Sequence, residues 1–295
     1  MHTNFSDVFC EAPDGLKLHA KTLGVENSST LPVLCLPGLT RTADDFDVIA
    51  RALVENAKAP RRVIAMDFRG RGLSEYDTKP ENYNVVTECG DVIALLASLK
   101  IPRAIFLGTS RGGLVSMVMA ATKPDLMAGL ILNDIGPALE IKGLMKIVGY
   151  IANPPPRKTF DEAARGLKEL FGSVFPKLGD AGWMAWAHRA FREKKDGSGL
   201  ERTYDLKLNK TLEGIDPSNP PAPIWDLFDK LAGKPLMLIH AELSDLVSPQ
   251  GVKDMVARRP DIDLVEVPDE GHAPLLADRP TIERILAFCA RCDRA

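Results

Sequence analysis

The sequence predicts an α/β protein built on a mostly parallel, doubly wound sheet. Short apolar runs alternate with longer helix-like segments along most of the chain, which is the pattern of βαβ units. These runs are continuously apolar, as expected for strands covered by helices on both faces. With 45% hydrophobic and 26% charged residues, the 295-residue chain has the composition to bury a sizeable core.

The expected elements follow in order. Asp14-Gly15 supplies the turn of an opening hairpin between residues 8–10 and 16–20. Expected strands lie at 32–36, 62–66, 104–107, 128–132, 235–239 and 264–267, and expected helices at 43–56, 86–99, 112–121, 249–257 and 280–289. Asp278 and Pro280 mark the start of the last helix, as its N-cap and first turn.

Residues 137–226 interrupt this alternation, and we predict that they form a mostly helical cap, or lid, inserted into a core of residues 1–136 and 227–295. The segment has no strong strand run, and it has proline-rich edges at 154–156 and 217–223. An insertion of this size between two strands is typical of a lid over a site at the strand ends.

The composition of the chain argues against nucleic acid and membranes as its binding partners. The formal charge of −3, from 37 basic and 40 acidic residues, gives no electrostatic case for nucleic acid. No apolar run is long enough for a membrane span, and residues 1–7 do not have the pattern of a secretory leader. The five scattered cysteines favour reduced thiols and a cytoplasmic location.

The strongest motif is Gly108-Thr109-Ser110-Arg111-Gly112, which follows the apolar run 103–107 and precedes a helical stretch. A nucleophilic serine needs a sharp strand-to-helix turn, so that its hydroxyl projects above the sheet. Small residues two before and two after it let the backbone close up around the turn. The motif therefore predicts Ser110 as a nucleophile.

A serine nucleophile needs a base, and the base needs an acid to orient it. His272 lies in a loop after the last expected strand, where the order Ser…Asp…His requires it, whereas His240 lies inside an apolar strand. Two carboxylates, Asp245 and Asp134, follow strands between the serine and the histidine. We favour Asp245, because its strand comes directly before the histidine strand, and keep Asp134 as the alternative.

The tetrahedral intermediate of acyl transfer also needs an oxyanion hole, usually made of backbone N–H groups. We expect one donor to be Arg111, which follows the serine. The other should be Leu39 in the loop 36–40, where Gly38 would permit an unusual turn that aims the next amide inward.

These features resemble the α/β-hydrolase fold superfamily. The resemblance rests on five motifs in the family's order: Leu36-Pro37-Gly38, the turn 67–74, the serine motif, Ser244-Asp245 and Gly271-His272. It implies the α/β-hydrolase fold, a helical cap at 137–226 and a triad of Ser110, Asp245 and His272, closest in type to serine esterases and lactonases. The serine excludes the haloalkane dehalogenase and epoxide hydrolase branches, which carry aspartate at that position.

We therefore expect a hydrolase that uses no cofactor or metal and cleaves a small carboxylic ester, lactone or thioester through an acyl-enzyme. Gly70-x-Gly72 lacks the third glycine of a dinucleotide fingerprint. A C–C bond hydrolase or an acyltransferase with the same triad is one alternative, and a ligand-binding receptor on a hydrolase scaffold is another. The sequence leaves the oligomeric state open.

Overall fold

The computed structural model describes residues 4–26, 28–152 and 155–294. Its main strands are β1 (Ser6–Glu11), β2 (Lys17–Leu23), β3 (Val33–Leu36), β4 (Val63–Asp67), β5 (Ala104–Thr109), β6 (Met127–Asn133), β9 (Leu236–Ala241) and β10 (Asp263–Val267). Within the described residues they form one eight-stranded sheet in the order β1-β2-β4-β3-β5-β6-β9-β10. The first two strands are an antiparallel hairpin, β2 pairs antiparallel with β4, and every later pair is parallel. The predicted mostly parallel sheet is confirmed.

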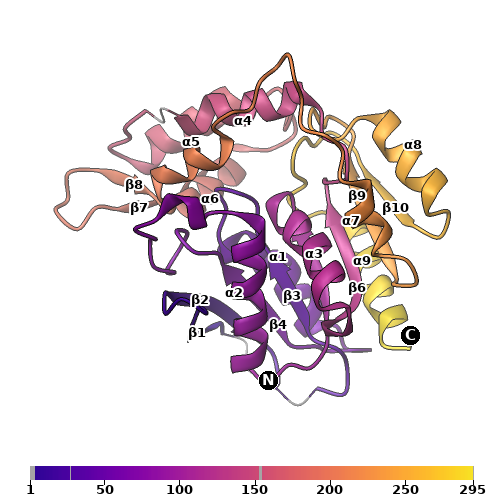
Figure 1. Ribbon diagram of the computed structural model, residues 1–295. Coiled ribbons are helices and arrows are strands. Elements are labelled where there is room, and N and C mark those ends of the chain that lie inside the picture. Colours follow the sequence, from indigo (N-terminus) through magenta and orange to yellow (C-terminus); the bar gives the residue numbers. More distant parts are fainter. Residues whose placement is uncertain (1–3, 27, 153–154, 295) are drawn as a thin grey trace.

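Helices cover both faces of this sheet, and each face has its own apolar core (Figure 1). On one face lie α1 (Asp47–Glu55) and α9 (Arg279–Cys292), and on the other α2 (Val85–Ser98), α3 (Arg111–Thr122) and α8 (Pro249–Arg258). Asp278 caps α9 as predicted, since its side chain accepts a hydrogen bond from the Thr281 amide. Burial on both faces explains why the parallel strands read as continuous apolar runs.

The segment predicted to form a cap, residues 137–226, lies over one end of the sheet, where Figure 1 shows α4, α5 and α6, and the last helix of the segment extends to Asp229. Its elements are α4 (Ile141–Ala152), α5 (Phe160–Phe171), α6 (Asp180–Ala190), β7 (Phe191–Glu193), β8 (Leu200–Arg202), η4 (Leu206–Leu212) and α7 (Trp225–Asp229). It contains an apolar cluster of its own around Trp183 and Trp186. The small β7–β8 hairpin was not predicted, because strands of three residues are too short to show alternation. Pro154 of the predicted proline-rich edge lies outside the described residues.

The turn 67–74 ties this insertion to the core. The Gly72 amide donates to the Thr203 carbonyl at 2.7 Å, and the Asp205 amide donates to the Gly70 carbonyl at 2.7 Å. Gly72 has φ +55°, and a Cβ there would lie 2.0 Å from an Asp67 carboxylate oxygen, so only glycine fits. The turn therefore has a structural role, and Gly70 and Gly72 are needed there because the neighbouring atoms leave no room for a side chain.

His19 of β2 is held in the same region with both ring nitrogens facing carboxylates. Nδ1 lies 2.7 Å from Asp67 and Nε2 lies 3.0 Å from Asp7. Burial alone would lower the pKa of His19, but the two carboxylates outweigh it, and the pKa is raised above its ordinary value. The arrangement suits a doubly protonated imidazolium, because carboxylates accept hydrogen bonds from both nitrogens.

In the described part of the chain, the helices are all too short or too polar to cross a bilayer.

Candidate active site

Ser110 lies on the sharp turn between β5 and α3. Its backbone has φ 49° and ψ −112°, a conformation that an L-residue adopts only under local constraint. A Cβ on Gly108 would come within 2.6 Å of the Gly112 backbone, and a Cβ on Gly112 within 2.1 Å of the Leu36 carbonyl oxygen. The two glycines are therefore required by close backbone approach, which is the reason for the spacing in the motif.

His272 links this serine to an aspartate. Its Nε2 lies 2.8 Å from Ser110 Oγ, and its Nδ1 lies 2.8 Å from Asp134 Oδ2. The Asp134 side chain is fully buried, and that of His272 is 12% exposed. When Nδ1–H donates to the aspartate, Nε2 is free to accept the serine hydroxyl proton, which is the tautomer that a general base needs.

The Asp134 carboxylate is itself held firmly at the end of β6. Oδ1 accepts a hydrogen bond from the Ala241 amide at 3.0 Å, and Oδ2 accepts one from Ser244 Oγ at 2.7 Å. Its backbone has φ 52°, so the residue begins a tight turn directly after the strand. These contacts fix the direction of the carboxylate toward His272.

The preference for Asp245 as the histidine's partner requires correction. Asp245 Oδ2 lies 2.9 Å from Lys146 Nζ of α4, and the structure places Asp134, the alternative, beside His272. The physical reason is distance along the chain: Asp134 directly follows its strand, whereas Asp245 lies four residues beyond Ala241, where the loop has turned toward α4. The number of residues between each aspartate and the end of its strand was the sequence signal that could have favoured Asp134 over Asp245.

The loop expected to supply a second oxyanion donor lies beside the serine. A Cβ built on Gly38 would be 3.8 Å from the Ser110 Cβ and 3.3 Å from the Arg41 side chain. Gly38 does not have a positive φ, and its carbonyl accepts a hydrogen bond from the Arg41 amide at 3.1 Å, which closes a turn directly after β3. Among the described residues, none accepts a hydrogen bond from the Leu39 amide. Arg111 begins α3, where the first amides have no partner within the helix.

A buried ionic network that the sequence analysis missed connects these two backbone positions. The Arg71 guanidinium, fully buried, donates to the Leu39 carbonyl at 2.8 Å and to Glu88 at 2.8 Å. Glu88 also accepts from Arg111 Nε at 2.6 Å. Burial alone would raise the pKa of Glu88, but the two guanidinium groups outweigh it and hold the pKa below its ordinary value. Glu88 therefore ties Arg71 and the Leu39 loop to the start of α3.

His240 has the structural role expected from its position in an apolar strand. Its Nδ1 lies 2.8 Å from Glu266, and its Nε2 lies 3.0 Å from the Val247 carbonyl. It is buried and does not contact the serine.

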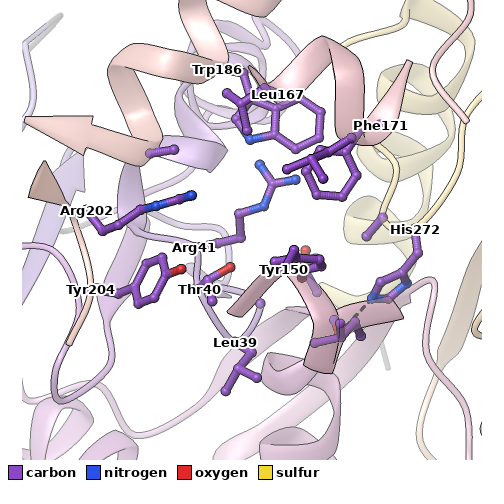
Figure 2. A pocket seen from close by; sticks show the side chains of 17 residues that line it. Leu39, Thr40, Arg41, Tyr150, Leu167, Phe171, Trp186, Arg202, Tyr204 and His272 are labelled. Carbon is purple, nitrogen blue, oxygen red and sulfur yellow. Dashed lines mark hydrogen bonds between the residues drawn. The ribbon is translucent and has the colours of Figure 1, made fainter. Parts of the chain in front are cut away.

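A pocket extends from Ser110 and His272 up to the insertion (Figure 2). Its walls combine apolar and aromatic side chains with a few polar groups: Ile147, Tyr150, Leu167, Leu170, Phe171, Trp186, Ala190, Arg202 and Tyr204 from the insertion, and Leu39, Thr40, Arg41, Thr109 and Ala273 from the core. Among the described residues, no group of three or more His, Cys, Asp or Glu side chains is arranged to hold a metal ion. The pocket thus has the hydrogen-bonded Ser110 and His272 side chains at one end and a largely apolar enclosure above them.

The fold and this arrangement define the class of protein. Residues 33–284 match the model of the alpha/beta hydrolase family, and the chain belongs to that family. Its relatives are hydrolases, and the chain is a hydrolase enzyme.

Individual relatives share most of the chain's length. It is 32% identical over 278 residues to a 3-hydroxybutyrate-oligomer hydrolase from Cupriavidus necator, covering 92% of both chains. It is 25% identical over 253 residues to a 2-(acetamidomethylene)succinate hydrolase from Mesorhizobium japonicum, covering 85% of both. The crystal structure of an alpha/beta hydrolase from Novosphingobium aromaticivorans superposes with a TM-score of 0.89 and 37% identity, over 99% of both chains. The resemblance to the superfamily is confirmed.

Proposed function

We propose that this hydrolase cleaves a carboxylic ester through a covalent acyl-enzyme on Ser110. The observation that carries the proposal is the line of hydrogen bonds from Ser110 Oγ through His272 to Asp134, with 2.8 Å at each step. This is the arrangement that activates a serine hydroxyl on unrelated folds.

In the proposed mechanism, His272 takes the hydroxyl proton while Ser110 Oγ bonds to the ester carbonyl carbon. The Leu39 and Arg111 amides stabilise the oxyanion, and their loops adjoin the serine. The protonated His272 then gives its proton to the leaving alkoxide. Water, deprotonated by the same imidazole, hydrolyses the acyl-enzyme and releases the acid. Asp134 keeps the imidazole in the required tautomer throughout.

The relatives favour an ester over the other bonds that such a triad cleaves. Units of a hydroxy-acid oligomer are joined by ester bonds, and the 3-hydroxybutyrate-oligomer hydrolase is 32% identical over nearly the whole chain. We propose that a small molecule of this kind is the substrate of this chain also, in preference to a lactone, a thioester or a C–C bond.

We also propose that residues 137–226 act as a lid. The support is that the insertion supplies most of the apolar wall above Ser110. In the described part of the chain the five cysteines are unpaired, which supports a cytoplasmic location.

Hydrolysis of p-nitrophenyl esters of increasing acyl length tests the proposal. We expect the wild-type protein to turn over short esters, Ser110→Ala to be inactive, and mass spectrometry of the quenched wild-type protein to find the acyl group on the peptide that contains residue 110. Ser98→Ala, at the C-terminal end of α2, is the matched control and should keep wild-type activity. Full activity in Ser110→Ala would overturn the proposal. A folded but inert wild-type protein would point to the C–C hydrolase, the acyltransferase or the receptor.

A further inference from the structure

Two polar atoms in the pocket wall make no hydrogen bond to any described residue. Arg202 Nε and the Tyr204 hydroxyl are buried, and neither makes a hydrogen bond among the described residues. Tyr204 as a whole is only 4% exposed. Leaving such groups without a hydrogen bond destabilises a folded protein, so two of them side by side in a pocket wall are suited to a polar group of a ligand that enters the pocket.

Both side chains point into the cavity. Figure 2 shows Arg202 and Tyr204 reaching inward from the side opposite His272. The Arg202 guanidinium carbon lies 4.4 Å from the Phe191 ring centre, so stacking on the neighbouring strand holds it in this direction. A ligand that contacts both groups would therefore span the pocket and present its other end to Ser110.

The charge of the pocket is unbalanced. Among the described residues that line it there are two arginines, Arg41 and Arg202, and no aspartate or glutamate. Arg41 is compensated, because its Nη1 lies 3.1 Å from Asp45 outside the pocket lining. Arg202 has no ion pair among the described residues, and burial together with the charge of Arg157 lowers its pKa.

We infer that the substrate carries a carboxylate at the end far from its scissile carbonyl, and that Arg202 and Tyr204 bind this carboxylate. The inference rests on the proposed ester hydrolysis and names the class of ester. A guanidinium presents parallel N–H groups that match the two oxygens of a carboxylate, and the phenol supplies a further donor. One cation and one hydroxyl suit a single negative charge, and the apolar walls between them and the serine suit a short hydrocarbon chain.

Matched pairs of esters test the inference. Each pair has the carboxylate in one member and an isosteric carboxamide in the other: 3-acetoxybutyrate with its primary amide, and monoethyl glutarate with the amide of its free acid. The first pair places the carboxylate on the alcohol side of the ester, and the second on the acyl side. We expect the wild-type protein to prefer the acid in at least one pair by about 10- to 100-fold in kcat/KM, the range of charged hydrogen bonds.

Arg202→Gln should abolish this preference, because it should lower kcat/KM for the acid member at least tenfold more than for the amide member, which makes no charged contact with the guanidinium. Tyr204→Phe should reduce the preference by several-fold. Arg192→Gln removes an arginine from the same hairpin, where it pairs with Glu201 at the surface, and should change neither member. Near-UV circular dichroism checks that each variant is folded.

A binding measurement tests the carboxylate site independently of whether the protein hydrolyses these esters. By calorimetry, Ser110→Ala should bind 3-hydroxybutyrate or glutarate, and Ser110→Ala with Arg202→Gln should bind at least tenfold more weakly, whether or not either ester is hydrolysed. Equal loss on both members of a pair in Arg202→Gln, or unchanged binding of both acids in the double variant, would overturn the carboxylate site while leaving ester hydrolysis by Ser110 intact.

Discussion

Asp134 and Asp245 are rival candidates for the carboxylate that orients His272, and their amide variants separate them. In Asp134→Asn the side-chain oxygen should face the Ala241 amide, because that amide can only donate. The new NH₂ group then faces His272 Nδ1. This favours the tautomer protonated on Nε2, which cannot accept the Ser110 proton.

The size of the effect follows from this geometry. A buried triad aspartate changed to asparagine lowers kcat by about 10⁴-fold in the well-studied serine proteases, or about 5 kcal/mol of transition-state stabilisation. Asp245 is 20% exposed and Lys146 is 38% exposed, so their ion pair is worth about 0–1 kcal/mol and lies outside the hydrogen-bonded line. We expect Asp245→Asn to keep kcat within about twofold of the wild type.

Initial rates with a p-nitrophenyl ester measure both variants, and thermal unfolding shows that both are folded. Asp245→Asn is the matched control, since it makes the same chemical change in a neighbouring loop. If Asp245→Asn lost activity by orders of magnitude while Asp134→Asn kept it, the assignment of the aspartate from the hydrogen bonds would be refuted.

Three further predictions concern the packing around Ser110, the loop that carries Leu39, and the ion pairs of His19. Gly112→Ala should lower the melting temperature and the activity, because its Cβ would meet a strand carbonyl at 2.1 Å, whereas Gly149→Ala, with nothing within 4 Å, should stabilise the protein by about 0.5–1 kcal/mol. Arg71→Lys should lower kcat about tenfold with little change in KM, because the loop that carries the Leu39 amide loses its guanidinium contact and the oxyanion is bound only in the transition state; an equal change in KM would contradict this. The pKa of His19 is raised on folding, so the stability that its ion pairs provide, about 1–3 kcal/mol, is fully present below about pH 6.5 and is lost as the pH rises through the folded-state pKa. Urea unfolding of wild type and His19→Gln between about pH 5.5 and pH 8.5 should show their stability difference shrinking with pH, and a difference that grows would refute the assignment.

Local patterns were enough to predict the strands and the helices of the core. Each buried strand is a continuous apolar run, because both of its faces are covered, and each helix start carries its own signal, as Asp278 does for α9. The turn at Ser110 was also readable, since the clashes that demand glycine at 108 and 112 arise within a few residues of the serine or from one adjacent strand. These features depend mostly on contacts between residues that are close together in the sequence.

The partner of His272 was decided by tertiary structure, because Asp134 and Asp245 satisfy the same order along the chain. The direction in which each loop leaves the sheet brings Asp134 to the histidine and Asp245 to α4. The Glu88 network likewise joins residues well apart in sequence, and it is packing around the pocket that leaves Arg202 Nε and the Tyr204 hydroxyl without a hydrogen bond among the described residues. A sequence shows which charges exist, but the burial of a charge and the position of its counter-ion depend on three-dimensional packing. Only the folded chain therefore shows that, among the described residues, two arginines and no acidic side chain line this pocket.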